Sequence, residues 1–170
     1  GVTRGVQIAG INNTVLNKVY AFQAAGVNNL VKGNFSGFQV AGVYNHVMDS
    51  VKGWQAAGVA NFAKNKVTGV QVAGVINFSN REMNGVQASG VINYAKKLKG
   101  VQIGLINIAD TSEGYSIGLI NIILKGYHKL SVFSNEITDF NVAFKTGNSK
   151  FYSILQAGVS PRDNDRIYSF

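Results

Sequence analysis

The stretch Gly69-Val70-Gln71-Val72-Ala73-Gly74-Val75-Ile76-Asn77 decides the fold, because near copies of it recur along most of the chain. The eight copies span residues 5–13, 21–29, 37–45, 53–61, 69–77, 85–93, 100–107 and 114–121. They share the pattern Gly, apolar or aromatic residue, Gln, small aliphatic residue, Ala, Gly, Val, variable residue, Asn. Internal similarity this strict indicates a repeat architecture.

Two amide-bearing positions define the period of the repeat. The glutamines recur every 16 residues and then after 15, at Gln7, Gln23, Gln39, Gln55, Gln71, Gln87 and Gln102. The asparagines recur every 16 residues and then twice after 14, at Asn13, Asn29, Asn45, Asn61, Asn77, Asn93, Asn107 and Asn121. In the last two copies the Ala-Gly pair becomes a lone Gly104 or Gly118, and Ser116 replaces the glutamine, so we expect less regular stacking there.

The repeat unit has the features of β structure. A unit of 16 residues is too short for a two-helix repeat, and stretches such as Val70 to Ala73 alternate with a period of two. An apolar position two residues before each copy keeps the same register, at Val19, Phe35, Val51, Val67, Met83 and Leu98. We therefore expect one strand and a turn, or two short strands, per unit, with polar loops between copies.

The favoured architecture is a β-solenoid in which each copy forms one coil. Equivalent residues of successive coils would then stack about 4.8 Å apart. Stacking explains why the amides are identical, because Gln and Asn side chains can bond to their own equivalents in ladders. It also explains Ala73-Gly74 as a corner where successive chains approach closely and where positive φ would favour glycine.

The alternative is an antiparallel outer-membrane-type β-barrel, since residues 69–78 have the length of a tilted membrane-spanning strand. In such a barrel, successive strands reverse, so alternate turns should differ and the period should approach 32 residues. The early links are instead alike, and the asparagine lies at the same end of every copy. This uniformity favours the solenoid. The barrel remains the alternative because of bulky residues that are either core filler or an apolar outer surface: Phe22, Phe38, Trp54 and Tyr115.

The repeats and the end of the chain form two predicted regions, 1–125 and 126–170. The second has alternating stretches at 129–133, 139–144 and 151–155, with a hairpin turn at 146–149. We expect antiparallel strands there. They would be either a cap on the last coil or the start of a larger barrel.

Composition excludes several classes of protein. The chain has 170 residues, of which 46% are hydrophobic and 14% charged, against about 25% charged in ordinary domains. Disorder is therefore not expected, and the lack of cysteine excludes disulfides and thiolate chemistry. No apolar run reaches the roughly 18 residues of a membrane helix. Because Gly1 opens directly on a motif, we expect a portion of a longer precursor.

The sequence shows no constellation of catalytic or metal-binding residues. His46 and His128 lack the short spacing of metal ligands, and the acids of the links form no acid and base pair. The copies carry amides where calcium-binding β-rolls carry aspartate, and they lack the ending of a phosphate-binding loop. We expect a protein without enzymatic activity, cofactor or metal.

A set of basic residues, called here the basic ridge, is the one candidate binding surface. It comprises Lys52, Lys64, Lys66, Arg81, Lys96, Lys97 and Lys99, which all fall in links between copies. Stacked coils would align them along one edge, where they could bind an anionic glycan, lipopolysaccharide or a membrane surface. They could equally keep the edge soluble and block strand pairing. Nucleic acid ranks lower because no RNA-binding signature is present.

The tandem motif of residues 69–77 resembles surface-repeat proteins predicted in Bacteroidota and in Leptospira, whose repeats read Gly-x-Gln-x-Ala-Gly-x-x-Asn. Residues 141–154 are similar to the strand-rich region that follows the repeats in those proteins. The resemblance implies export to the bacterial cell envelope, to the outer membrane or cell surface, and supplies no catalytic residue. We expect a structural or adhesive envelope protein. The alternative is an integral outer-membrane barrel that binds or conducts a small solute.

Overall fold

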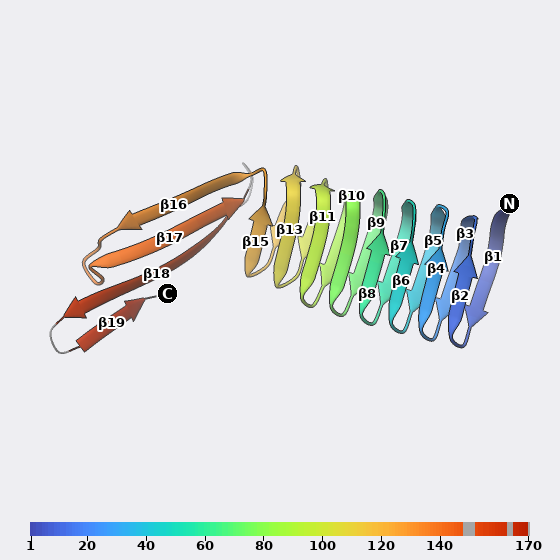
Figure 1. Cartoon of the computed structure of the whole chain (residues 1–170), viewed down its shortest axis with the longest axis horizontal. Coiled ribbons are helices and arrows are strands. Elements are labelled where there is room, and N and C mark those ends of the chain that lie inside the picture. Colours follow the sequence, from blue (N-terminus) through green and yellow to red (C-terminus); the bar gives the residue numbers. More distant parts are fainter. Residues whose placement is uncertain (148–151, 163–164, 170) are drawn as a thin grey trace.

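A computed structural model describes residues 1–147, 152–162 and 165–169, and the elements in these ranges are all β-strands. The repeats form a parallel β-solenoid of about eight turns, and an antiparallel sheet follows it. Figure 1 shows the coils stacked along the long axis of the molecule, with the antiparallel sheet beyond the last coil. The favoured fold is therefore confirmed.

Each coil contributes one strand before the Ala-Gly corner and one after it, so the solenoid has two stacks. The glutamine stack contains β1 (Val2–Ala9), β3 (Lys18–Ala25), β5 (Phe35–Ala41), β7 (Val51–Ala57), β9 (Val67–Ala73), β12 (Val101–Ile103) and β14 (Tyr115–Ile117). The asparagine stack contains β2 (Asn12–Val15), β4 (Asn28–Val31), β6 (Tyr44–Val47), β8 (Ala60–Ala63), β11 (Ile92–Leu98), β13 (Ile106–Ser112) and β15 (Ile120–Ile123). Strand β10 (Ile76–Ser89) continues from the asparagine stack into the glutamine stack.

Pairing in both stacks is parallel and joins equivalent residues of adjacent coils. Gln55 pairs with Gln71 between β7 and β9, and Asn61 pairs with Asn77 between β8 and β10. Neighbouring copies therefore run in the same direction, which excludes the antiparallel barrel for residues 1–125.

The shortened last copies keep the amide residues paired. Gln102 still pairs with Gln87, and Asn107 still pairs with Asn93. The missing alanine falls between these positions, where β12 ends at Ile103 and the Gly104 N–H donates to the Ile117 carbonyl of the later coil at 3.1 Å. The expected loss of regularity is therefore found in part: a second residue is lost in the link after Asn93, where the register between β10 and β11 shifts between Ser79 and Glu82.

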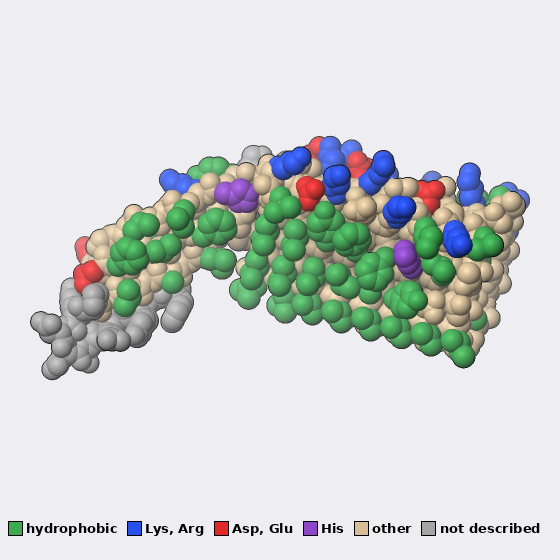
Figure 2. Space-filling view, viewed as in Figure 1, with side chains coloured by type: hydrophobic (Ala, Val, Ile, Leu, Met, Phe, Trp, Pro, Cys, Tyr) green, Lys and Arg blue, Asp and Glu red, His purple; other side chains and the backbone are tan. Residues whose placement is uncertain are grey.

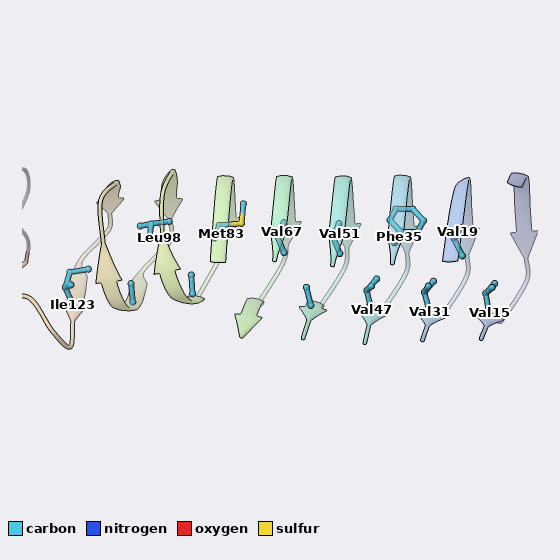
Figure 3. Close-up of a cluster of buried hydrophobic side chains, with 13 residues drawn as sticks. Val15, Val19, Val31, Phe35, Val47, Val51, Val67, Met83, Leu98 and Ile123 are labelled. Atoms are coloured by element: carbon cyan, nitrogen blue, oxygen red, sulfur yellow. The ribbon is translucent and has the colours of Figure 1, made fainter. Parts of the chain in front are cut away.

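The apolar part of the core lies next to the links. The apolar position before each copy forms one buried column, with Val19, Phe35, Val51, Val67, Met83 and Leu98 at 0 to 1% exposure. A second column on the asparagine stack contains Val15, Val31, Val47, Ala63, Ala95, Ala109 and Ile123. Figure 3 shows the two columns facing each other between the stacks. Each coil supplies only a few side chains to this core, so the burial of these side chains depends on the neighbouring coils.

Glycine is required at two points in the copies that begin at Gly37, Gly53, Gly69 and Gly85. At Gly69, φ is +133°, and an added Cβ would lie 2.0 Å from the carbonyl oxygen of Gly53. At the Gly74 corner an added Cβ would lie 2.1 Å from the carbonyl oxygen of Gly58. The corner thus needs glycine for close approach, as expected, whereas the positive φ occurs at the first glycine of the copy instead.

The end region is a four-stranded antiparallel sheet in chain order: β16 (Tyr127–Phe133), β17 (Phe140–Gly147), β18 (Tyr152–Arg162) and β19 (Asp165–Ser169). It confirms the predicted antiparallel strands. The predicted hairpin turn at 146–149 lies partly outside the described residues. The Asn121 Nδ2 donates to Ser153 Oγ at 2.7 Å, so β18 bonds to the last coil at the end of the asparagine column.

Candidate functional site

The glutamines form a continuous ladder inside the solenoid. Each Nε2 donates to the Oε1 of the glutamine one coil earlier, from Gln23 to Gln7 through Gln102 to Gln87, at 2.5 to 2.9 Å. The six glutamines after Gln7 are at most 1% exposed. Ser116 extends the column with a hydroxyl group that donates to Gln102 Oε1 at 3.4 Å. Buried amides of this kind are stable only because each is hydrogen-bonded.

The asparagines form a second ladder with the opposite direction of donation. Each Nδ2 donates to the Oδ1 of the asparagine one coil later, from Asn13 to Asn29 through Asn107 to Asn121, at 2.8 to 3.0 Å. The same Nδ2 also donates to the carbonyl just before the corner of the later coil, as from Asn61 to Val72 at 2.7 Å. Asparagine thus holds the corner of the next coil, which explains why it follows the corner at a fixed distance.

The basic ridge lies along the link edge, but acids interrupt it. Lys66 and Lys99 both bind Glu82, at 2.8 and 3.0 Å, and Lys97 binds Glu113 at 2.6 Å. Of the seven predicted ridge residues, Lys52, Lys64, Arg81 and Lys96 make no ion pair within the described parts of the chain. The structure therefore divides the predicted set into three paired and four unpaired cations.

Charge on this edge stays strongly positive despite the acids. Residues 1–125 contain eleven Lys and Arg against four Asp and Glu. Hydrogen bonds from Lys66 and Lys99 hold the pKa of the Glu82 carboxyl below its ordinary value, and the Glu113 carboxylate raises the pKa of Lys97. These pairs are ionised at neutral pH, so they reduce the charge locally without removing it.

Two grooves open on the link edge between these cations. One, of about 330 Å³, is lined by Lys18, Lys52 and Lys66 together with the polar side chains of Asn34, Ser36, Ser50 and Thr68. The other, of about 520 Å³, is lined by Asn80, Arg81, Glu82, Lys96 and Lys97. The first groove offers ammonium, hydroxyl and amide donors, which are suited to bind the oxygens of an anion. The second offers ammonium, guanidinium and amide donors beside the Glu82 carboxylate.

Aromatic side chains form short columns on both outer faces. Phe38 and Trp54 stack on the glutamine stack with ring centroids 6.0 Å apart, and Phe78 and Tyr94 stack on the asparagine stack at 4.8 Å. Phe38 and Trp54 are each 53% exposed. The bulky residues at the first apolar position are therefore outer surface rather than core filler.

The rest of the outer surface of the solenoid is free of charge. None of the eight copies contains Lys, Arg, Asp or Glu. The corner opposite the ridge carries one aliphatic side chain per coil, which we call the apolar edge: Ile11, Val27, Val43, Val59, Val75, Val91, Leu105 and Leu119. Figure 2 shows Lys and Arg gathered along one edge and hydrophobic side chains along the opposite edge. Sequence reasoning did not identify this surface, although the absence of charge from every copy was visible in the repeat.

The titratable residues outside the ridge form no reactive cluster. His46 is half-buried against Phe62, at 6.0 Å between ring centroids, and burial lowers its pKa. His128 lies in β16, near Phe144. Within the described residues, no group of three or more His, Cys, Asp or Glu is placed to hold a metal ion, and no helix is suited to cross a membrane.

Comparison with known proteins gives no relative. No protein-family model, curated protein or solved structure matches this chain.

Proposed function

We propose that this chain is a non-enzymatic repeat protein of a bacterial cell envelope, with a structural or adhesive role that its link edge performs. The repeat motif, which resembles envelope surface-repeat proteins, supports this location. The adhesive partner is an extended polyanion, such as an acidic glycan or the saccharide part of lipopolysaccharide.

The use of the recurrent polar residues supports a non-catalytic role. The Gln and Asn of each copy are bonded to one another in the interior, so the most regular polar groups of the chain stabilise the coil. Their regular recurrence is explained by folding, and no reaction is needed to account for it.

The observation that carries the proposal is the row of cations along the link edge, where Lys52, Lys64, Arg81 and Lys96 make no ion pair within the described residues. Successive coils place the links about 4.8 Å apart, and this spacing lies well inside a Debye length of roughly 8 Å. The potentials of neighbouring cations therefore overlap along the edge. A chain of anionic sugars can meet several coils at once, whereas a compact anion meets only one.

A charge-reversal pair with a matched control tests this proposal. Lys64 and Lys96 are exposed, have no acid partner within the described residues and lie two coils apart on the link edge. Lys64→Glu with Lys96→Glu should lower the salt concentration at which the protein elutes from a heparin column. Lys129→Glu with Lys145→Glu changes the net charge equally but lies in β16 and β17.

We expect the control pair to elute with the wild type and the ridge pair to elute earlier. Elution of all three proteins at one salt concentration would show that the ridge does not bind polyanions. Lys66 and Lys97 are left unchanged, because reversing them would break the pairs with Glu82 and Glu113 and confuse binding with stability.

A further inference from the structure

The outer surface of the solenoid changes in a fixed order from one edge to the other. The apolar edge carries only aliphatic side chains, aromatic side chains follow on both faces, and the charged residues come last, at the links. Aliphatic, aromatic and basic groups occur in the same order from the hydrocarbon of a bilayer to its headgroups. The order points to a lipid surface.

The depth of these bands matches one leaflet. Trp54 lies five residues before Val59 of the apolar edge, and because β7 ends at Ala57, the two residues are at most about 16 Å apart. The hydrocarbon of a bilayer is about 30 Å thick, so one leaflet accounts for about 15 Å. With Val59 at the centre of the bilayer, Trp54 would lie at the hydrocarbon boundary, and Lys52 would lie about 7 Å further out, among the headgroups.

The backbone at the apolar edge is compatible with a medium that offers no hydrogen bonds. The corner N–H of Val43 donates to the Val27 carbonyl at 2.9 Å, and those of Val59 and Val75 donate to the preceding edge residue at 2.9 and 3.0 Å. Backbone groups in lipid must be paired within the protein, and the N–H groups of these three corners meet this requirement.

We infer that the apolar edge of the solenoid inserts into one leaflet of a lipid bilayer, with the aromatic columns at the interface and the link cations among anionic headgroups. Charge complementarity selects this occupant. A second copy of the chain would cover the apolar edge. It would not explain why aromatic side chains lie next to that edge and basic side chains lie beyond them. Insertion of the apolar edge does not require polyanion binding at the link edge, although the link cations would take part in both.

Vesicle flotation tests the insertion. Val59→Asp with Val75→Asp places two carboxylates on the apolar edge at exposed positions. Leu130→Asp with Val132→Asp makes the same kind of change at exposed positions of β16, outside the solenoid, and is the matched control. We expect wild type and control to float with phosphatidylcholine vesicles, and more strongly when phosphatidylglycerol is included, while the edge variant stays with the soluble fraction.

Trp54 gives a second readout, because it is the single tryptophan of the chain. Its emission should shift to shorter wavelength when vesicles are added to the wild type, and brominated lipids should quench it. This measurement needs no variant and therefore does not depend on how the substitutions fold.

Three results would overturn the inference: no flotation of the wild type with either vesicle, equal flotation of the edge variant, or a lipid-free dimer that the Val59 and Val75 substitutions dissociate. Heparin elution of the edge variant separates the two proposals. If the edge variant elutes from heparin like the wild type but no longer floats, the apolar edge is needed for lipid binding and not for polyanion binding. Failure of heparin binding in all variants counts only against polyanion binding by the basic ridge.

Discussion

At the scale of the residue, each buried amide stabilises the coils on both sides of it. Asn77 accepts from Asn61 at 2.9 Å and donates to Asn93 at 3.0 Å and to the Ala88 carbonyl at 2.7 Å. Removal of the side chain leaves these neighbours unsatisfied in an interior without water, and an unsatisfied buried polar group costs about 1 to 3 kcal/mol.

We therefore predict that Asn77→Ala lowers the free energy of unfolding by about 1 to 3 kcal/mol, measured by urea denaturation. Asn80→Ala, in the exposed link three residues later, is the control and should leave stability nearly unchanged. Equal midpoints for the two variants would contradict a stabilising asparagine ladder.

The ladder positions could be predicted from the sequence because identity at a fixed spacing has few physical causes. A buried apolar column tolerates Val, Phe, Met or Leu, as residues 19 to 98 show, whereas an amide ladder requires the same group in each coil. The direction of donation could not be predicted, since either direction satisfies the same amides. The ion pairs of Glu82 were also missed, because Lys66 and Lys99 come from different coils and meet it only after stacking.

At the scale of the element, the corner of one coil limits the size of the side chain that the next corner can accept. The first coil provides a natural comparison: nothing lies within 4 Å of a Cβ added at Gly10, whereas one added at Gly74 meets the carbonyl oxygen of Gly58. The two glycines occupy the same position of the repeat and differ in whether a coil precedes them.

Gly74→Ala should therefore destabilise the protein by about 1 to 3 kcal/mol, the usual range for an overpacked interior. Gly10→Ala should be neutral or stabilise by about 0.4 to 1 kcal/mol, because alanine restricts the unfolded chain. Thermal unfolding followed by circular dichroism would measure both. A similar loss of stability in the two variants would mean that the corners do not approach as closely as the structure shows.

The direction of the strands could also be predicted, from links of one length and an asparagine always at the same end. The irregularity expected for the shortened copies occurs in part: the Gln and Asn pairs are kept, but the register between β10 and β11 shifts between Ser79 and Glu82, where the link loses a residue. Sequence periodicity reports the number of residues per coil, but it does not show which part of the coil can lose one.

At the scale of the whole molecule, the two ends of the solenoid differ. The last coil is bonded to the antiparallel sheet through Asn121 and Ser153, whereas the first coil has a neighbour on one side only, and Gln7 and Asn13 are just half-buried. In repeat proteins, stability is approximately the sum of each unit and its interfaces with its neighbours.

We predict that amide hydrogen exchange is fastest in β1 and β2 and slowest in the central strands β5 to β10. Mass spectrometry of peptides from each coil would measure the gradient, which reflects the free energy of local opening. Uniform protection from the first coil to the last would instead indicate that the solenoid opens as a single cooperative unit.

The opposite directions of the two ladders have an electrostatic consequence. Each carboxamide carries a dipole close to that of a peptide unit, about 3.5 D, and a single column of aligned amides would sum to a large axial dipole, as in a helix. Here the glutamine and asparagine columns point in opposite directions along the same axis, so each added coil contributes two dipoles that largely offset one another. The interior can therefore gain or lose whole coils without accumulating an axial field, and the number of repeats is free to vary with the length of surface that a partner requires.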